Sequence, residues 1–386
     1  MASLLPAMAR VATLRIACIA PAVPQETAQW VRRLGATIAH FPRPPVRGMR
    51  LWGERARMLA TGSNLVWRKA EQRFFAAQRH EVAPHLVWLE TPYLLRYALS
   101  WRATLPLVVD YWGTSGGARR DYQHARGLRR LWEWLRWRAA LGGERRYARL
   151  LPYLVTVSSL DAAHFRALTP ESRIWAIPNG RFGGAGEAGA GAWEPPPNPQ
   201  QLIMTGDLGY RPNVDAAQYF ARQILPLIQA RRPEARLRLV GRDPLPAVLA
   251  LARLPGVEVQ GYVPDLAAAI RQAAVYILPM RLGSGIRSKL FDVFPLGKPI
   301  VSTTVGAEGL ELVHNQNCLI ADTAEEFARA CLYVLEHEAE QRRLGAQAQR
   351  LALEVYSQAN VERLVAAALG EMLQAGACSP ESRWGV

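Results

Sequence analysis

Short apolar runs alternate with helical patterns along the whole chain. Runs that favour buried strands occur at 14–20, 86–89, 107–110, 154–158, 202–205, 237–240, 257–259, 275–278, 300–302 and 319–321. The stretches between these runs fit helices, among them 215–230 and 265–273, and 325–373 is mostly helical. Strands that alternate with helices predict βαβ units and therefore an α/β fold with parallel sheets.

A segment rich in glycine, alanine and proline separates two such series. Residues 183–199 read GGAGEAGAGAWEPPPNP, which is the composition of a linker. The chain of 386 residues is also longer than one ordinary hydrophobic core requires. We therefore expect a first domain at 1–182, a linker at 183–199 and a second domain at 200–386.

The stretch 274–310 combines a strand with a glycine-rich loop and a helix. The apolar run at 275–278 predicts a buried parallel strand that ends at Pro279. Gly283 and Gly285 follow where the next helix must begin. Glycine lets the backbone come close to a ligand, and the N–H groups of a first helical turn attract an anion.

Two cations stand at the start of this helix. Arg287 and Lys289 lie in its first turn or just beyond, where the helix dipole disfavours positive charge. One explanation is a pair of solvated charges, with Lys289 paired to Asp292. The other is a site for an anionic ligand.

A second polar loop follows the next strand. Leu290, Phe291 and Phe294 form the buried stripe of the helix, and Gly297 ends it before the strand at 300–302. The polar or small residues after that strand are Thr303, Thr304, Gly306 and Glu308. Two loops at the carboxyl ends of neighbouring parallel strands predict a ligand-binding crevice.

The run PMRLGSGIRSKLFDVFPLGKPIVSTTVGAEGL resembles the donor-binding segment of the retaining family-four glycosyltransferases. Supporting segments precede it in the order IPNGRF, MTGDLGYRPNVDA, VGRDP and VQGYVPD, so that the resemblance covers roughly the second half of the chain. It implies the GT-B fold, with two facing Rossmann-like domains and a last helix that crosses back to the first domain.

The resemblance also implies roles for individual residues. Lys289 and Arg287 are expected to act on the donor diphosphate, and Asp292 to accept hydrogen bonds from the ribose hydroxyls. The full set expected to bind the donor is Gly206, Asn213, Gly283, Ser284, Gly285, Asp292, Thr304 and Glu308. Three positions depart from the family: Ser284 and Asp292 stand where its E-x7-E pattern has glutamates, and Asp207 replaces an arginine beside Gly206.

The activity implied is transfer of a sugar, such as a hexosyl group, from a nucleoside diphosphate to a glycan or lipid-linked acceptor, as in polysaccharide biosynthesis. The transfer is expected to be retaining and to need no cofactor and no metal, because no D-x-D motif occurs. Asp110, at the end of a first-domain strand, is a candidate contact for the acceptor. The alternatives are a sugar-nucleotide epimerase, or a non-catalytic module of the same fold that binds nucleotides or membranes.

The composition of the chain also predicts an anionic partner. The formal charge is +15, and 116–150 holds ten arginines against three acids together with Trp132, Trp134 and Trp137. This segment is either a solvated helix with its tryptophans in the core, or a patch for an anionic membrane surface. No nucleic-acid-binding motif accompanies it, so no nucleic acid is expected.

Location is predicted from the absence of long apolar runs. No run reaches the ~18 residues of a membrane span, and Arg10 and Arg15 interrupt the apolar start, which argues against a signal peptide. We expect a cytoplasmic protein, peripheral on the inner face of the membrane. The cysteines and histidines have no metal-ligand spacing.

Overall fold

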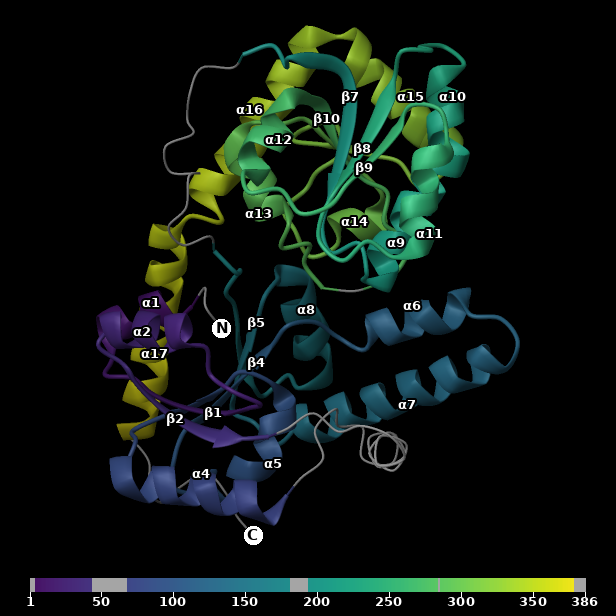
Figure 1. Ribbon diagram of the computed structural model, residues 1–386. Coiled ribbons are helices and arrows are strands. Elements are labelled where there is room, and N and C mark those ends of the chain that lie inside the picture. The colour runs from purple at the N-terminus through teal and green to yellow at the C-terminus, as the bar shows by residue number, and fades with distance from the viewer. Residues whose placement is uncertain (1–3, 44–67, 181–193, 284, 378–386) are drawn as a thin grey trace. The chain divides into compact units, whose positions relative to one another are not determined.

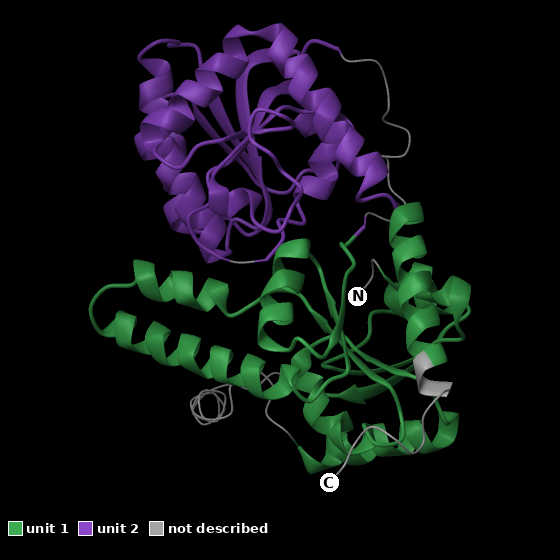
Figure 2. Cartoon of the chain, turned by 180° about the vertical axis from the view of Figure 1, so that it is seen from behind, with its two compact units in different colours: residues 1–179, 358–386 green, residues 180–357 purple. Residues whose placement is uncertain are grey.

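The computed structural model describes residues 4–43, 68–180, 194–283 and 285–377 (Figure 1). The chain divides into two compact units (Figure 2). The first unit comprises 1–179 and 358–386, and the second comprises 180–357. Most of the expected linker, 183–193, lies outside the described residues, and Asn198 already belongs to a strand.

The first unit contains two parallel sheets. β1 (Arg15–Ala20) pairs with β2 (Thr37–Pro42), and a four-stranded sheet has the order β3 (Val87–Leu89), β4 (Leu107–Tyr111), β5 (Tyr153–Thr156) and β6 (Arg173–Ala176). The expected strands are present within one or two residues of their predicted bounds, whereas β2 and β6 were not predicted.

Helices connect these strands. They are α1 (Leu5–Val11), α2 (Gln25–Arg33), α4 (Lys69–Val82), η1 (Pro92–Leu94), α5 (Leu95–Ala98), η2 (Leu99–Trp101), α6 (Gly116–His124), α7 (Leu128–Ala148), α8 (Ser159–Leu168) and α17 (Gln358–Ala377). α17 returns to pack against α1, where Arg10 forms an ion pair of 2.6 Å with Glu362. At the start of α8 the Ser158 side chain accepts a hydrogen bond from Asp161 N, so Ser158 is the N-cap.

The second unit is built on one six-stranded parallel sheet with helices on both sides (Figure 1). Its strands, in spatial order, are β12 (Leu319–Ile320), β11 (Ile300–Ser302), β10 (Ala273–Leu278), β7 (Asn198–Thr205), β8 (Arg236–Val240) and β9 (Val257–Gln260). All of β10 is buried, as expected for a parallel strand covered on both faces.

The helices of this unit follow the strand–helix alternation. They are α9 (Arg211–Tyr219), η3 (Phe220–Ile224), α10 (Leu225–Gln229), α11 (Pro246–Leu249), η4 (Ala250–Arg253), α12 (Leu266–Gln272), α13 (Leu290–Val293), η5 (Phe294–Leu296), α14 (Thr304–Ala307), α15 (Ala324–Glu336) and α16 (Glu338–Glu354). Leu290, Phe291 and Phe294 are buried, and Gly297 ends the segment in the left-handed region at φ 60°.

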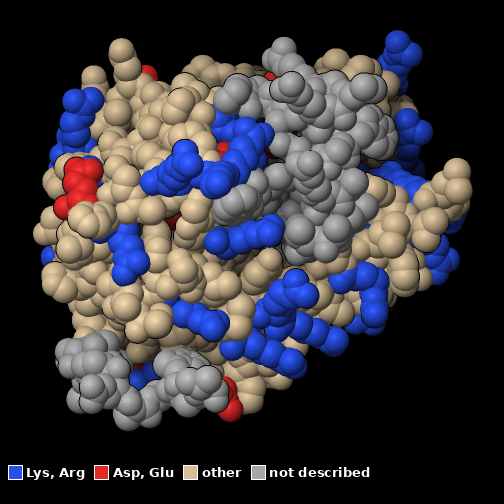
Figure 3. Space-filling view, turned by 90° about the horizontal axis from the view of Figure 1, so that it is seen from below, with Lys and Arg blue, Asp and Glu red and all other residues tan. Residues whose placement is uncertain are grey.

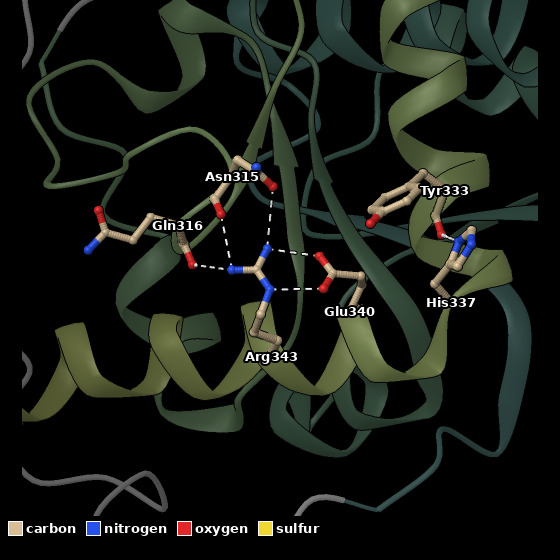
Figure 4. Close-up of polar contacts among 6 residues, drawn as sticks. All are labelled: Asn315, Gln316, Tyr333, His337, Glu340 and Arg343. Atoms are coloured by element: carbon tan, nitrogen blue, oxygen red, sulfur yellow. Dashed lines mark hydrogen bonds and ion pairs between the residues drawn. The ribbon is translucent and has the colours of Figure 1, made fainter.

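Two basic side chains of this unit are structural. Lys298 is buried and donates to Arg271 O at 2.6 Å and Ala273 O at 2.8 Å, which caps the end of α12. Burial lowers the pKa of Lys298 to about 8, and nearby Arg271 contributes. On α16, Arg343 donates to both carboxylate oxygens of Glu340, at 2.9 and 2.8 Å, and to Asn315 O at 3.0 Å (Figure 4). Arg343 therefore holds the turn before β12.

The tryptophans of the basic segment are not in the core, contrary to the first of the two explanations above. The side chains of Trp132 and Trp134 are 36% and 40% exposed. Trp137 stacks on Tyr122 of the neighbouring helix, with ring centroids 5.8 Å apart. Within the described part of the chain, no helix has the length and apolar character needed to cross a membrane.

Candidate functional site

The candidate site lies where the connections of the second sheet change direction. β7 and β10 are neighbours, but the chain runs from β7 towards β8 and from β10 towards β11, on opposite sides. The loops that follow these two strands therefore diverge at the carboxyl edge of the sheet, which is where open α/β sheets bind ligands. Figure 1 shows α9, α13 and α14 at this edge.

Lys289 and Asn213 meet at this edge. Lys289 is the residue before α13, and its Nζ donates to Asn213 Oδ1 in the first turn of α9, at 2.7 Å. The Asn213 amide in turn donates to Asp207 O at 2.8 Å. Of the two explanations for Lys289, the contact with Asn213 favours a built site, because 76 residues separate these side chains in sequence.

Gly206 leaves room for this contact. It follows β7 with φ 142°, and a Cβ at this position would lie 2.8 Å from Lys289 Nζ and 3.0 Å from Asn213 Nδ2. Gly206 N donates to Val240 O at 3.0 Å, which fixes the loop to the end of β8. Glycine is therefore needed here for both conformation and space.

Arg287 and Gly283 lie beside this cluster. A Cβ on Gly283 would be 3.3 Å from Arg287 Nη1 and 3.4 Å from Cγ of Pro212 on α9. The guanidinium of Arg287 is buried and donates to Val305 O at 3.1 Å. Arg287 thus joins the loop after β10 to the loop after β11, besides placing positive charge near Lys289.

The electrostatic environment of Lys289 favours an anionic ligand. Burial lowers the pKa of Lys289 to about 7, and the positive charge of Arg287 contributes. An anion bound near the two cations would raise the pKa of Lys289 again, since an opposite charge favours the protonated amine. The site is therefore arranged for negative charge.

Asp207, which stands where the family has an arginine, has a structural role. Its Oδ1 accepts hydrogen bonds from Gly209 N at 2.9 Å and Tyr210 N at 3.1 Å, as in a turn before a helix. Its Oδ2 lies 3.4 Å from the guanidinium of Arg242, which is 70% exposed. Asp207 therefore shapes the loop that carries Gly206.

The loop after β11 is a short helix, α14, and not the open loop that we expected. Thr303 caps it by accepting from Gly306 N at 3.0 Å. Thr304 is exposed, and its hydroxyl donates to Asp322 Oδ2 at 2.7 Å. Glu308 ends the helix. Thr304 is therefore held by Asp322, a partner that was not predicted from the sequence.

The remaining predicted residues of the second unit lie on the same loop and helix. Gly285 has φ 76°, a conformation that favours glycine. Asp292 is half-buried on α13, and its negative charge adds to burial in raising the pKa of Tyr276 on β10. Ser284 lies outside the described residues.

One ion pair that ties the two loops together was not predicted. Arg281, just after β10, donates to both carboxylate oxygens of Asp215 on α9, at 2.8 and 3.1 Å. Its guanidinium also lies 4.1 Å from the ring centroid of Tyr219. Its sequence signal is an arginine three residues after the predicted strand 275–278.

Asp110 belongs to the first unit, at the carboxyl end of β4. It is 1% exposed, accepts a hydrogen bond from Trp112 Nε1 at 3.2 Å, and neighbours Glu90 at the end of β3. Burial raises the pKa of Asp110 to about 7, and the charge of Glu90 contributes. Glu90 was missed, although it directly follows the predicted run 86–89.

Comparisons with known proteins match the second unit to a family and the whole chain to a fold. Residues 199–337 match the family model of glycosyl transferases group 1. No curated protein matches the chain. Among solved structures, HepE from Anabaena, in complex with UDP and glucose, is similar over 96% of this chain and 95% of its own, with 14% identity and a TM-score of 0.61.

Two further structures are similar over nearly the whole chain. Sucrose-phosphate synthase from Thermosynechococcus elongatus matches 95% of this chain and 100% of its own, with 15% identity and a TM-score of 0.63. A glycosyltransferase from Rickettsia africae matches 95% and 99%, with 10% identity and a TM-score of 0.59. Residues 199–337 are therefore similar in sequence to the group 1 glycosyltransferases, and the chain has the α/β fold of the GT-B glycosyltransferase structures.

Proposed function

We propose that the protein is a retaining glycosyltransferase that transfers a sugar from a nucleoside diphosphate to a glycan or lipid-linked acceptor without a metal ion. The observation that carries the proposal is the contact of Lys289 with Asn213 beside Gly206, at the carboxyl edge of β7 and β10. The group 1 family match and the UDP and glucose in the HepE structure support a nucleotide-sugar donor.

We propose partners at this edge for the diphosphate and the ribose of the donor. Lys289 and Arg287 supply positive charge for the diphosphate, and glycines at 206, 283 and 285 let its oxygens approach the backbone. Asp292 accepts from the ribose hydroxyls. Ser284, Thr304 and Glu308 complete the set proposed for the donor.

The chemistry proposed needs stabilisation of the leaving group more than a dedicated base. As the bond from the sugar to the diphosphate breaks, negative charge grows on the departing phosphate, and Lys289 and Arg287 stabilise it. The departing phosphate takes the proton of the acceptor hydroxyl on the same face of the sugar, which retains the configuration. We propose that Asp110 contacts the acceptor.

The proposal is tested by product analysis. UDP-, GDP- and ADP-sugars are incubated with the protein and a panel of glycan and lipid-linked acceptors in EDTA, and the anomeric configuration of the product is read by NMR. A glycosylated acceptor with the donor's configuration supports the proposal. An inverted product, or a strict need for added metal, would contradict those parts of it.

Two other functions give different products. A sugar-nucleotide epimerase would change the donor sugar without any acceptor. A non-catalytic module would bind nucleotide and release no sugar, and Ser284 in place of a family glutamate favours this second candidate.

Donor affinity should fall as the pH rises above 7. The pKa of Lys289 is about 7 in the free protein, so the amine is mostly neutral at pH 8, and a bound diphosphate raises that pKa. Binding then takes up a proton, and affinity decreases by up to about tenfold per pH unit. Calorimetry with UDP-glucose from pH 6.5 to 9, in two buffers of different ionisation enthalpy, measures both effects. Constant affinity across this range would contradict a Lys289 amine that is largely neutral in the free protein and takes up a proton when the diphosphate binds.

A further inference from the structure

The helices α6 and α7 form a hairpin that extends away from the sheets of the first unit, as both ribbon views show (Figures 1 and 2). We call residues 116–148 the arm. Because the arm extends in this way, the sheets do not cover one side of α7.

The side of α7 that faces α6 makes aromatic and ionic contacts with it. Trp137 stacks on Tyr122, and Arg136 forms an ion pair of 3.0 Å with Asp121. Glu133 is 3% exposed and lies 3.0 Å from the guanidinium of Arg136. The polar and aromatic groups on this side therefore hold the hairpin together.

The other side of α7 exposes large apolar side chains. Leu128, Leu131 and Leu135, at positions i, i+3 and i+7, share one face of the helix and are 91%, 58% and 40% exposed. Trp132, at i+4, lies on the same face and is 36% exposed. Exposed apolar residues that are clustered in this way mark an interaction surface.

The charge around this face is strongly positive. Residues 116–150 contain ten arginines and three acids, and the acids Asp121 and Glu133 are engaged inside the hairpin. Glu144 contacts His164 of α8 at 3.3 Å. Figure 3 shows a face of the molecule on which Lys and Arg are widespread and Asp and Glu are few.

We propose that the arm binds the surface of an anionic lipid bilayer, with Leu128, Leu131, Trp132 and Leu135 in the headgroup region and the surrounding arginines on lipid phosphates. Tryptophan and arginine both suit this interface, and an anionic leaflet attracts each nearby cation. A second copy of this chain fits less well, because two arms of the same positive charge would repel each other. The proposal does not depend on donor binding.

Co-sedimentation with vesicles tests the arm. The full chain is mixed with vesicles of phosphatidylglycerol and phosphatidylcholine, or of phosphatidylcholine alone. The variant Leu128→Ser/Leu131→Ser/Leu135→Ser removes the apolar face, and Leu249→Ser/Leu353→Ser removes two leucines of the second unit that are 50% and 63% exposed. Wild type and the control should bind anionic vesicles, and the arm variant roughly tenfold or more weakly.

A charge variant covers the case in which the leucine variant fails to fold. Arg126→Glu/Arg138→Glu keeps the apolar face and should also bind anionic vesicles several-fold more weakly. Binding by the wild type should weaken as salt rises from about 50 to about 300 mM, because salt screens the charges. Equal binding to neutral and anionic vesicles, or unchanged binding by both variants, would overturn the proposal. A wild-type dimer that becomes a monomer in the arm variant, without vesicle binding, would assign the face to a second copy.

Discussion

Lys289→Ala should lower the affinity for the donor nucleotide by roughly a hundredfold. The substitution removes the amine that reaches Asn213 beside Gly206, and with it a charge-assisted contact to the diphosphate. Hydrogen bonds to charged groups contribute about 1.5–3 kcal/mol, and 1.4 kcal/mol is tenfold in affinity. Calorimetric titration with the nucleoside diphosphate measures the loss.

The chain offers a matched control for this change. Its lysines are Lys69, Lys289 and Lys298. Lys69→Ala removes an exposed lysine from α4 of the first unit and should leave donor affinity unchanged. If Lys289→Ala binds the nucleotide as wild type does, while its thermal unfolding is also unchanged, Lys289 is not a donor contact.

Gly241→Ala should disrupt both the stability of the second unit and its donor affinity. Gly241 follows β8, and a Cβ there would lie 1.6 Å from Gly206 O and 2.7 Å from Gly206 C. These are backbone atoms, so the loop that carries Gly206 would have to move away from Lys289 and Asn213. Overpacking of this kind costs about 1–3 kcal/mol, and the displaced loop should also lose most of the donor affinity.

Gly261→Ala provides the control in the neighbouring loop. No atom lies within 4 Å of a Cβ built at Gly261, although Gly261 O accepts a hydrogen bond from Gly241 N. Urea unfolding and nucleotide titration of both variants distinguish the effect of the clash at Gly241 from the effect of replacing a glycine by alanine. Wild-type stability and affinity in Gly241→Ala would show that the contact between the two loops has no role in shaping the site.

The central strands β10 and β11 of the second unit could be predicted because they are buried on both faces. The run 275–278 is continuously apolar, and Ile300 and Val301 begin β11, so each strand is recognisable from its own residues. β2 and β6 lack this signal. β2 contains His40 and ends at Pro42, and β6 begins with an exposed arginine.

The loops of the site could be located from sequence, but their contacts could not. Glycines after a strand and cations before a helix mark an anion site through local chemistry alone. The pairing of Lys289 with Asn213 and of Arg281 with Asp215 depends on β10 lying beside β7, which brings together residues 76 and 66 positions apart. The role of Lys298 likewise depends on carbonyls of α12, which no motif specifies.

The arm shows that helical periodicity does not reveal what a helix packs against. Leu128, Leu131 and Leu135 have the spacing of a core-facing stripe, which favours burial when the sequence is read alone. In the structure α7 contacts α6 through Trp137 and Arg136 instead, and the leucines are exposed. The same spacing thus has a different consequence in a hairpin that stands apart from the sheets.

The most direct test of the donor site is calorimetric titration of the protein with UDP, GDP, ADP and their sugars, first in EDTA and then in magnesium. The account predicts saturable binding of one of these nucleotides in EDTA, no requirement for magnesium, and roughly hundredfold weaker binding in Lys289→Ala. Absence of binding to all of them in both conditions would contradict a donor site at the carboxyl edge of β7 and β10.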